Sequence, residues 1–306
     1  MKNLNELNIK FVQKRKIWYI ISLLIIIPGI ISLFAQSLNF GIDFTGGNLL
    51  QIQFTQNVEI ADVREVVNDY TDKETSIQSA DNIKYSIRTA ALTAEAGNQL
   101  LDALENSFGE FEILSNEFIG PIIGQELMKN ALMSLAIAMV LMLIYIAFRF
   151  KIRFSLAAIL ALCHDALVTI CIFSLLQIEV NSVFVAAILT VVGYSINNTI
   201  VVFDRIRENM ERSKKYNFTD TVNLSINQTI TRSVNTVLAV LFFLLSILFF
   251  GGESTKVFAL AMTIGILAGT YSSMCLAGSF LVDFRAGGSN NYKPVQKINN
   301  TKIKEA

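Results

Sequence analysis

Charged residues are scarce in this sequence, and their scarcity excludes an ordinary soluble protein. Asp, Glu, Lys and Arg make up 16% of the 306 residues, against 53% hydrophobic residues. Such a composition lies well outside that of an average soluble domain and predicts a membrane protein. The formal net charge is zero, so there is no basic excess of the kind that binds nucleic acid, and we expect no nucleic-acid partner.

Cysteine and histidine are too few for a disulfide framework or for the common metal sites. All three cysteines, Cys163, Cys171 and Cys275, lie inside apolar runs, where a thiol behaves as a small buried hydrophobe. His164 is the only histidine, so a metal cage of histidines is implausible. We therefore expect no metal site and no bound cofactor.

Enzyme signatures are also lacking. The pair Gly46-Gly47 does not open a helix as a phosphate-binding loop would, and no lysine of such a loop follows it. Gly193 and Ser195 lack the second glycine of a nucleophile elbow, and they lie in an apolar run rather than in a strand-to-helix turn. Because no set of nucleophile, base and oxyanion donors can be assembled, we expect that the protein is not an enzyme.

Long apolar runs are the main feature that the sequence does contain. A run of about 18 or more apolar residues is long enough to cross the hydrocarbon core of a membrane as a helix. Six runs are predicted to do so: Ile17 to Phe34, Ala131 to Phe148, Phe154 to Leu176, Val183 to Phe203, Val234 to Phe250 and Val257 to Val282. The first is interpreted as an uncleaved span, because no small-x-small cleavage pattern follows it.

Lysine and arginine gather in some of the connecting segments, which predicts how the chain is oriented. Cytoplasmic loops are enriched in these residues. Segment 1–16, the turn at Arg149–Arg153, the loop 204–232 and the tail 283–306 carry them, so both termini are expected in the cytoplasm. The tail lacks apolar periodicity and is expected to be disordered. Residues 131–282 are then expected to form a region of five spans.

Segment 38–129 is the one large polar stretch between predicted spans, and we expect it outside the cytoplasm as a small α+β domain. Alternating hydrophobicity predicts strands at Asn48 to Phe54 and at Asn82 to Thr89. Phe111 to Ile119 is a further strand candidate, and a short strand is expected near Ser76. Helical spacing predicts helices at Ile60 to Tyr70 and Thr93 to Phe108. The resulting order β-α-β-β-α-β is ferredoxin-like and places both helices on one face of a sheet.

Polar residues inside the predicted spans are the candidates for chemistry, because a charge at mid-membrane costs about 2.5 to 3.5 kcal/mol. His164 and Asp165 lie near the middle of the third span, where Asp165 is a candidate ion site and His164 a candidate proton carrier. A purely structural role is the alternative for both. In the fourth span, Tyr194, Asn198 and Arg205 fall near one face of the helix and form a polar stripe.

Two other features of the spans have simpler structural interpretations. Arg232 lies at the start of the fifth span, where it either joins a polar path or extends to the lipid headgroups. In the sixth span, small residues recur at every fourth position, including Gly265, Gly269 and Ser273. Such a stripe lets helices approach closely and predicts a packing seam.

Motifs at separate places resemble the SecD/SecF family of protein-export membrane proteins. Residues 39–47 read NFGIDFTGG, which is similar to the family signature after the first span. Residues 119–127 resemble the start of the second span in the SecF branch of the family, and residues 193–209, GYSINNTIVVFDRIREN, resemble its fourth span. The residues that carry this likeness are Gly41, Asp43, Gly46, Gly47, Gly193, Tyr194, Asn197, Asp204 and Arg205.

The resemblance implies a fold and a function. It implies an RND-like membrane region embedded in the lipid of a bacterial-type inner (cytoplasmic) membrane. It also implies partnership with SecD, association with the SecYEG channel and YajC as a further partner. Members of the family use the proton-motive force, or in some cases sodium ions, to pull an emerging unfolded polypeptide outward during the late stage of export. H⁺ or Na⁺ would then be the coupling ion. By the same likeness, Asp165 and Arg232 match positions associated with the ion pathway.

One residue departs from the family pattern. Where the family usually has an intramembrane aspartate, this chain has Asn198, and an amide cannot take up or release a proton near neutral pH. Three hypotheses follow: the partner SecD or Asp165 carries the titration, a different ion is coupled, or the change was engineered to mimic a protonated carboxylate.

Two other functions stay open at this point. The first is an RND-type half-transporter for a small molecule or lipid, in which the same polar spans serve a different cargo. The second is a structural subunit of the translocase without ion coupling, which Asn198 favours. This second function predicts that substitutions of Asp165 or Arg232 have no effect.

Overall fold

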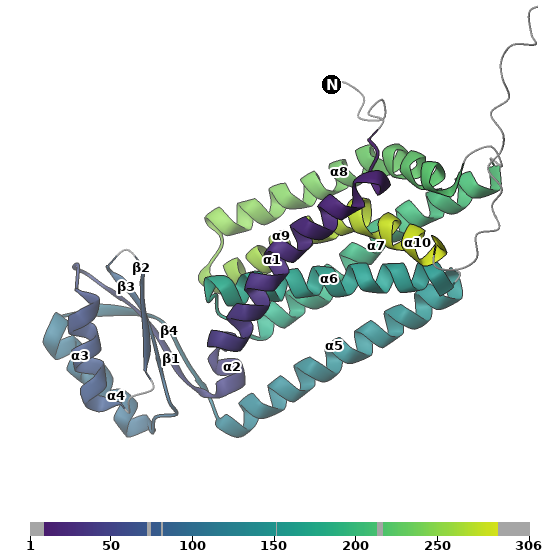
Figure 1. Ribbon diagram of the computed structural model, residues 1–306. Coiled ribbons are helices and arrows are strands. Elements are labelled where there is room, and N and C mark those ends of the chain that lie inside the picture. Colours follow the sequence, from purple (N-terminus) through teal and green to yellow (C-terminus); the bar gives the residue numbers. More distant parts are fainter. Residues whose placement is uncertain (1–8, 72–74, 81, 151, 213–216, 287–306) are drawn as a thin grey trace, which may run out of the picture. The chain divides into compact units, whose positions relative to one another are not determined.

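The computed structural model describes residues 9–71, 75–80, 82–150, 152–212 and 217–286, which form helices and one sheet (Figure 1). The chain divides into two compact units. The first, called the membrane unit, comprises Met1–Ser37, Ala138–Gln177 and Ala186–Ala306. The second, called the sheet unit, comprises Leu38–Ile137 and Ile178–Val185.

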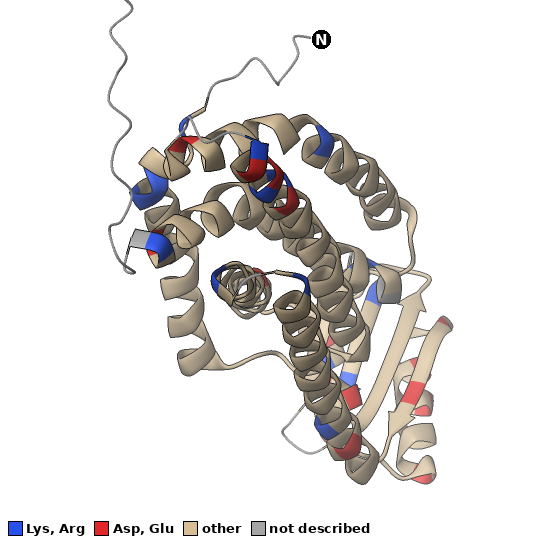
Figure 2. Cartoon of the chain, turned by 90° about the vertical axis from the view of Figure 1, so that its right-hand side faces the viewer, with Lys and Arg blue, Asp and Glu red and all other residues tan. Residues whose placement is uncertain are grey.

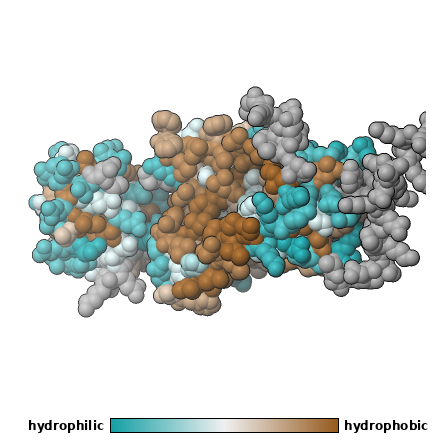
Figure 3. Space-filling view, turned by 45° about the horizontal axis from the view of Figure 1, so that its top comes forward, coloured by the Kyte–Doolittle hydropathy of each residue, from teal (hydrophilic) through white to brown (hydrophobic). Residues whose placement is uncertain are grey.

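Six helical stretches are long and apolar enough to cross a membrane, as the six apolar runs predicted. In chain order they are Val12–Gln36, Pro121–Arg149, Ile152–Leu176, Ser182–Arg212, Phe218–Phe250 and Thr255–Arg285. Large apolar side chains such as Phe148 and Phe250 are exposed on them, and Figure 3 shows a broad hydrophobic surface with hydrophilic residues on either side of it. Hydrocarbon suits such a surface better than water does, so this is a multi-pass membrane protein.

The membrane helices run beyond the apolar stretches that predicted them. They are α1 (Arg15–Gln36), α5 (Pro121–Arg149), α6 (Ile152–Leu176), α7 (Ser182–Arg212), α8 (Phe218–Phe250), α9 (Glu253–Tyr271), a π-helical turn (Ser272–Leu276) and α10 (Ala277–Ala286). Because α7 continues to Arg212 and α8 begins at Phe218, the described part of segment 204–232 is helical apart from Asn217. Beyond Ala286, the predicted tail 283–306 lies outside the described residues, as do residues 1–8.

Amide side chains explain why α8 begins before its apolar run. Asn217 caps the helix by accepting a hydrogen bond from the backbone of Asp220 at 3.1 Å. Further along α8, Asn223 accepts a hydrogen bond from the Val12 backbone at 3.0 Å, and Asn227, one turn after Asn223, bonds both backbone groups of Ile9. The polar start of α8 is therefore ordered by the segment before α1.

Glycines allow the membrane helices to approach one another closely. A Cβ atom at Gly265 on α9 would lie 2.3 Å from a methyl carbon of Val191 on α7. A Cβ atom at Gly29 on α1 would lie 2.2 Å from the Cβ of Cys171 on α6. Van der Waals packing of this kind holds helices together in lipid, where no hydrophobic force acts between them.

Charged residues lie mainly toward the ends of the membrane helices (Figure 2). Arg149, the last residue of α5, pairs with Asp204 of α7 at 3.1 Å. Arg15, the first residue of α1, pairs with Asp283 of α10 at 3.1 Å. The middle stretches of the helices are left to apolar side chains and to the few polar groups described in the next section.

The sheet unit has the predicted order of strands and helices. Its elements are a short helix α2 (Ile42–Thr45), β1 (Gly47–Phe54), α3 (Ile60–Tyr70), β2 (Ser76–Ala80), β3 (Lys84–Thr89), α4 (Ala94–Phe108) and β4 (Phe111–Ile119). The strands form one antiparallel sheet in the order β2-β3-β1-β4, and α3 and α4 cover one face of it (Figure 1). The short helix α2 was not predicted.

Alternating side chains build the core of the sheet unit. Leu50, Ile52 and Phe54 of β1 point to the same side of the sheet and are buried. Leu100 and Leu104 of α4 meet them in one apolar cluster, because they are spaced by one helical turn. The alternation in β1 and the helical spacing in α4 therefore place apolar side chains in a single core, as the β-α-β-β-α-β pattern predicted.

Candidate functional site

Asp165 lies in the middle of α6 with 1% of its surface exposed, and three side chains hold its carboxylate. Ser195 of α7 donates a hydrogen bond to Oδ2 at 2.5 Å, and Ser272 of the π-helical turn donates to the same oxygen at 2.8 Å. Nδ1 of the adjacent His164 lies 3.0 Å from Oδ1. A buried carboxylate is costly unless it is hydrogen-bonded in this way, so the site joins three segments of the membrane unit.

A chain of hydrogen bonds leads from Asp165 through His164 to α1. Nε2 of His164 lies 3.0 Å from the hydroxyl of Ser22 on α1. That hydroxyl lies 3.3 Å from the hydroxyl of Tyr271, which donates to the backbone carbonyl of Trp18 at 2.5 Å. Imidazole and hydroxyl groups can each donate and accept, so the chain is chemically able to pass a proton to or from the carboxylate.

Two local features of the stretch Thr255–Arg285 allow Ser272, which it contains, and Ser195 of α7 to reach this carboxylate. A Cβ atom at Gly269 would lie 2.9 Å from Oγ of Ser195 and 3.4 Å from Oδ2 of Asp165, so glycine leaves room for both. The next residues form the π-helical turn Ser272–Leu276, whose wider turn changes the direction of the side chains that follow α9. Single π turns within α-helices are frequent at functional sites.

Three polar side chains of α7 are buried near Ser195 without a partner in the described part of the chain. They are the hydroxyl of Tyr194, Nδ2 of Asn198 and the hydroxyl of Thr199. Thr199 follows Ser195 by one helical turn, so the two hydroxyls lie on the same face. A buried unsatisfied polar group costs about 1 to 3 kcal/mol. The two hydroxyl oxygens are able to coordinate a small cation, and all three groups are able to hydrogen-bond with water.

The structure does not bring all the predicted site residues together. Asp165 and His164 contact each other, but no hydrogen bond among the described residues joins either of them to Asn198 or Arg232. Arg232 is exposed on α8, and none of the ion pairs between described residues includes it. Asn197 is exposed half-way along α7. The predicted site residues therefore separate into the contacting pair His164 and Asp165, the buried Asn198, and the exposed Asn197 and Arg232.

The motif residues at the end of α7 form a charged cluster. Asp204 pairs with Arg149, as described above, and Arg205 donates to Gln228 of α8 and to Glu208, both at 2.6 Å. Gly193 has no atom near the position of a Cβ, so packing does not require glycine there. The polar stripe predicted from Tyr194 through Asn198 to Arg205 thus ends in a link between α7 and α8.

The glycines of the predicted family signature have steric causes within the sheet unit. Gly46 and Gly47 have φ angles of 73° and 124°, which side chains other than glycine rarely adopt. A Cβ atom at Gly47 would also lie 2.3 Å from the carbonyl oxygen of Thr89. At Gly41, a Cβ atom would lie 2.4 Å from Oε1 of Glu179. Larger residues would therefore displace β3 or the loop that contains Glu179.

Asp43 of the same signature caps the start of α7. Its Oδ2 atom accepts a hydrogen bond from the backbone N–H of Ser182 at 2.7 Å and another from the Ser182 hydroxyl. The first N–H groups of a helix lack partners within the helix, and a carboxylate there also interacts favourably with the helix dipole. Asp43 therefore fixes the first turn of α7 to the sheet unit, to which residues 178–185 belong.

An ion pair strengthens the same junction. Arg88 of β3 contacts Glu179 just before α7, and Arg88 also donates to Asn39 at 3.3 Å. Burial raises the pKa of the Glu179 carboxyl, an effect that the neighbouring charge of Arg88 opposes and that of Asp43 adds to. Burial is the largest of these effects, so this carboxyl holds its proton more tightly than an exposed glutamate does.

Sequence reasoning did not find several of the residues that complete the buried site. Ser22, Ser272 and Tyr271 carry no pattern that separates them from other polar residues in apolar helices. Ser195 stands inside the predicted motif of the fourth span, but it was not selected as a site residue. Its closeness to Asp165 depends on how α6 and α7 pack, and no spacing within one helix reveals that distance.

Comparison with known proteins gives a consistent set of relatives. Residues 99–287 match the family model "Protein export membrane protein SecD/SecF, C-terminal", and residues 31–58 match the "SecD/SecF GG Motif". The chain is 38% identical over 278 residues to the protein translocase subunit SecF of Sebaldella termitidis, covering 89% of this chain and 90% of that protein. It is 44% identical over 282 residues to that of Acidaminococcus fermentans, covering 90% and 96%.

A solved structure is similar over nearly the whole chain. The crystal structure of SecDF, a translocon-associated membrane protein from Thermus thermophilus, superposes with a TM-score of 0.84 at 36% sequence identity. The match covers 90% of this chain and 38% of the solved chain. The likeness thus extends over both the membrane helices and the sheet.

Proposed function

This chain belongs to the SecD/SecF family of protein-export membrane proteins and, within it, to the SecF translocase subunits, and we propose that it uses an ion gradient, together with a SecD partner, to promote the late stage of protein export. A translocase subunit of this kind is a transporter rather than an enzyme. The coupling ion would be H⁺ or Na⁺.

The buried carboxylate of Asp165 is the observation that carries this proposal. It is the most deeply buried carboxylate among the described residues, and it is held by groups that can exchange hydrogen bonds rather than by a fixed cation. Ionisable residues inside membrane segments commonly mark ion paths. Binding or release of an ion at Oδ2 would change its bonds to Ser195 and Ser272, and hence the contact of α6 with α7 and with the π-helical turn.

Asn198 supports placing the ion exchange at Asp165 in this subunit. An amide cannot titrate, so the position at which the family usually has an aspartate offers only hydrogen bonds here. Its Nδ2 atom is buried without a partner in the described part of the chain. We propose that Asn198 and Arg232 line the ion path and that Asp165 is the group in this chain that binds the ion.

Polar groups on the membrane surface support partnership with SecD. Asn197 of α7 and Arg232, Asn235 and Thr236 of α8 are all exposed. Polar side chains within membrane helices face protein or water rather than lipid. We therefore propose that SecD covers this surface. The solved relative is a SecDF chain of which this chain spans 38%, and the rest of that chain is long enough to include such a partner.

The orientation and the remaining partners are also proposals. Basic residues in segments 1–16, 149–153, 204–232 and 283–306 support a cytoplasmic location for these segments and for both termini. The sheet unit would then lie on the outer side of the bacterial inner membrane, where the emerging polypeptide leaves the SecYEG channel. Association with SecYEG and YajC rests on the family resemblance alone.

The test is secretion of a reporter protein from vesicles that contain this chain, its SecD partner and the Sec channel, with and without an imposed ion gradient. We expect that the gradient accelerates secretion by the parent and that Asp165→Asn abolishes this acceleration. Asp69→Asn, which changes an exposed carboxylate on α3, serves as the matched control and should behave like the parent. Secretion that responds equally to the gradient in the parent and in Asp165→Asn would contradict the proposal.

The same experiment separates the proposed function from its alternatives. A structural subunit without ion coupling would support secretion that does not depend on the gradient in any variant. A half-transporter for a small molecule or lipid would leave secretion unchanged when the chain is omitted. Asn198→Asp adds a further comparison, because a second titratable group in the path should alter the dependence on pH if protons are the coupling ion.

A further inference from the structure

The strand β4 presents a free edge. It is the terminal strand in the order β2-β3-β1-β4, spans nine residues and pairs only with β1 among the described strands. An edge strand has a row of backbone N–H and C=O groups that can pair with another extended chain. The opposite edge, β2, has five residues and offers less length.

A bulge divides this edge into two parts. The pairing with β1 shifts between Gln51 and Ile52, because Ser115 pairs with Gln51 and Ile113 pairs with Ile52. Leu114 is therefore the extra residue. Bulges limit uncontrolled pairing along an edge, so the stretch from Ser115 to Ile119 is the regular part on which a further strand can align.

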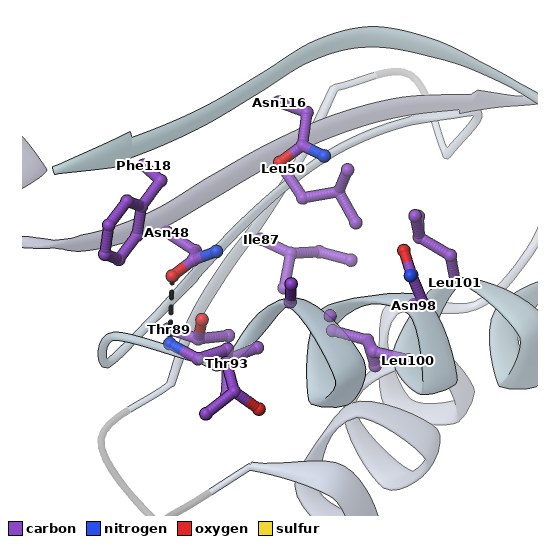
Figure 4. Close-up of a pocket in the computed structure, with 13 residues that line it drawn as sticks. Asn48, Leu50, Ile87, Thr89, Thr93, Asn98, Leu100, Leu101, Asn116 and Phe118 are labelled. Carbon is purple, nitrogen blue, oxygen red and sulfur yellow. Dashed lines mark hydrogen bonds between the residues drawn. The ribbon is translucent and has the colours of Figure 1, made fainter.

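An apolar groove lies beside this regular stretch, between β4 and α4 (Figure 4). It has a volume of about 530 Å³. Leu50 and Ile87 of the sheet form its floor, Phe118 stands on the β4 side, and Leu101 stands on the α4 side. On α4, Gly97 has no atom near the position of a Cβ, so the helix leaves open space there.

The groove is uncharged, and apolar residues beside it are exposed. None of the 13 residues that line it is ionisable. The register pairs Asn48 with Phe118 and Ile52 with Ile113, which places both β4 side chains on the helix-covered face of the sheet. Phe118 is nevertheless 60% exposed and Ile113 47% exposed. Exposed large apolar side chains beside a groove mark an interaction surface.

The other face of β4 is acidic. Glu112, Ser115 and Glu117 point away from the groove, and both glutamates are exposed. A strand added to β4 would place alternate side chains beside these carboxylates, where lysine or arginine is favoured and acidic residues are disfavoured. A second copy of β4 is a poor partner for the same reason, since it would bring further glutamates to this face.

We propose that this edge and groove bind an extended segment of the exported polypeptide, in which apolar side chains alternate with basic or neutral ones. The apolar side chains enter the groove beside Phe118, the basic ones lie beside Glu117, and backbone hydrogen bonds to β4 hold the segment without regard to its exact sequence. This inference rests on the proposed function, because it names the surface on which the sheet unit holds its client.

The test measures peptide binding to the full chain in lipid nanodiscs without any ion gradient. The probes are fluorescent decapeptides in which leucine alternates with lysine, with threonine or with glutamate, and fluorescence anisotropy reports the dissociation constant. We expect the leucine–lysine peptide to bind and the leucine–glutamate peptide to bind at least tenfold more weakly. Methylation of alternate backbone nitrogens on the leucine–lysine peptide should abolish binding, because it removes the donors that pair with β4.

Two substitutions locate the site. Phe118→Ser should weaken binding of the leucine–lysine peptide about tenfold, as loss of an aromatic anchor does at other interfaces. The matched control is Tyr70→Ser, which removes an exposed aromatic residue from α3 and should leave binding unchanged. Glu117→Gln should reduce the preference for lysine over threonine while leaving the leucine–threonine peptide bound as before.

Several results would overturn the proposal and would leave the proposed function intact. They are equal binding of all the peptides, binding that survives backbone methylation, or equal effects of Phe118→Ser and Tyr70→Ser. Binding that disappears when SecD is present would show that the edge belongs to the interface between subunits. If gradient-driven secretion fails in vesicles while peptide binding follows the predicted pattern, the ion-coupling proposal is wrong and this binding surface stands.

Discussion

The two units of this chain distribute polar and apolar side chains in opposite ways. In the sheet unit, Ile52, Phe54 and Leu104 are buried, and charged residues such as Asp69 and Glu112 are exposed. In the membrane unit, Phe148 and Phe250 are about nine-tenths exposed, whereas serine, threonine and asparagine side chains are buried. Of the buried polar residues in the described part of the chain, only Thr89 belongs to the sheet unit.

The difference follows from the surroundings of each unit. Water drives apolar side chains into the core of the sheet unit, so its stability comes mainly from burial. Lipid is as apolar as leucine, so the membrane helices depend on close packing and on hydrogen bonds between helices. The polar interior of the membrane unit is thus available for ion chemistry, and the uncharged groove of the sheet unit is suited to an apolar client.

The largest effect is expected from removing a core side chain of the sheet unit. Leu104 is fully buried, and Leu104→Ala should lower the free energy of unfolding of this unit by about 2 to 5 kcal/mol. Hydrogen exchange followed by mass spectrometry on the full chain should show faster exchange in β1 and little change in α6. Leu114→Ala, at the exposed bulge, is the control and should have almost no effect. Equal acceleration in α6 would break the comparison, because the units would then not be independent.

A smaller effect is expected from removing one hydroxyl at the buried carboxylate. Ser195→Ala or Ser272→Ala should destabilise the membrane unit by about 1.5 to 3 kcal/mol, the range for hydrogen bonds to charged groups. Thermal unfolding in detergent measures the loss, with Ser246→Ala on the exposed face of α8 as control. If both variants are as stable as the control, the carboxylate does not depend on these hydroxyls, and the polar interior has no structural role.

The smallest expected effect is a dependence of the stability of the sheet unit on pH. Burial raises the pKa of Glu179, so the folded state binds its proton more tightly than the unfolded chain does. The contribution of Glu179 to folding stability is fully present below the pKa that this carboxyl has in the unfolded chain. It is lost as the pH rises through the pKa that the carboxyl has in the folded state. Amide hydrogen exchange in β3 of the parent, corrected for the intrinsic effect of pH on exchange, should therefore become faster as the pH rises through this range.

Glu179→Gln should remove that dependence, whereas Glu95→Gln, which changes an exposed carboxylate of α4, should retain it. A parent whose sheet unit becomes more stable as the pH rises through the same range would show that the ion pair with Arg88, rather than burial, governs this carboxyl.

Much of the fold follows from periodicity, and the exceptions have identifiable causes. The apolar runs predicted the six membrane helices, and alternation predicted β1 and β3, which together with two further strand candidates gave the order of elements in the sheet unit. The early start of α8 was missed because its first turns are polar and are stabilised by the segment at Ile9 and Val12. The short helix α2 was missed because four residues are too few to show a helical period.

The candidate site could be predicted only in part. Depth in the third span singled out His164 and Asp165, since a charge in lipid is costly wherever it lies. The hydroxyls of Ser22, Ser195 and Ser272 carry no such penalty, and their role appears only when three segments pack around one carboxylate. Asn198 was visible as a departure from the family pattern, but its lack of a partner among the described residues is a property of the packed helix.

The central claim is that the Asp165 carboxyl binds the coupling ion, and carbodiimide labelling tests it most directly. Dicyclohexylcarbodiimide reacts with protonated carboxyl groups in apolar surroundings, and mass spectrometry identifies the modified residue. The account predicts labelling of Asp165 that falls as the pH rises if protons are the ion, or that falls when Na⁺ is added at constant pH if sodium is the ion. Labelling that is absent at every pH, or that responds to neither ion, would contradict it.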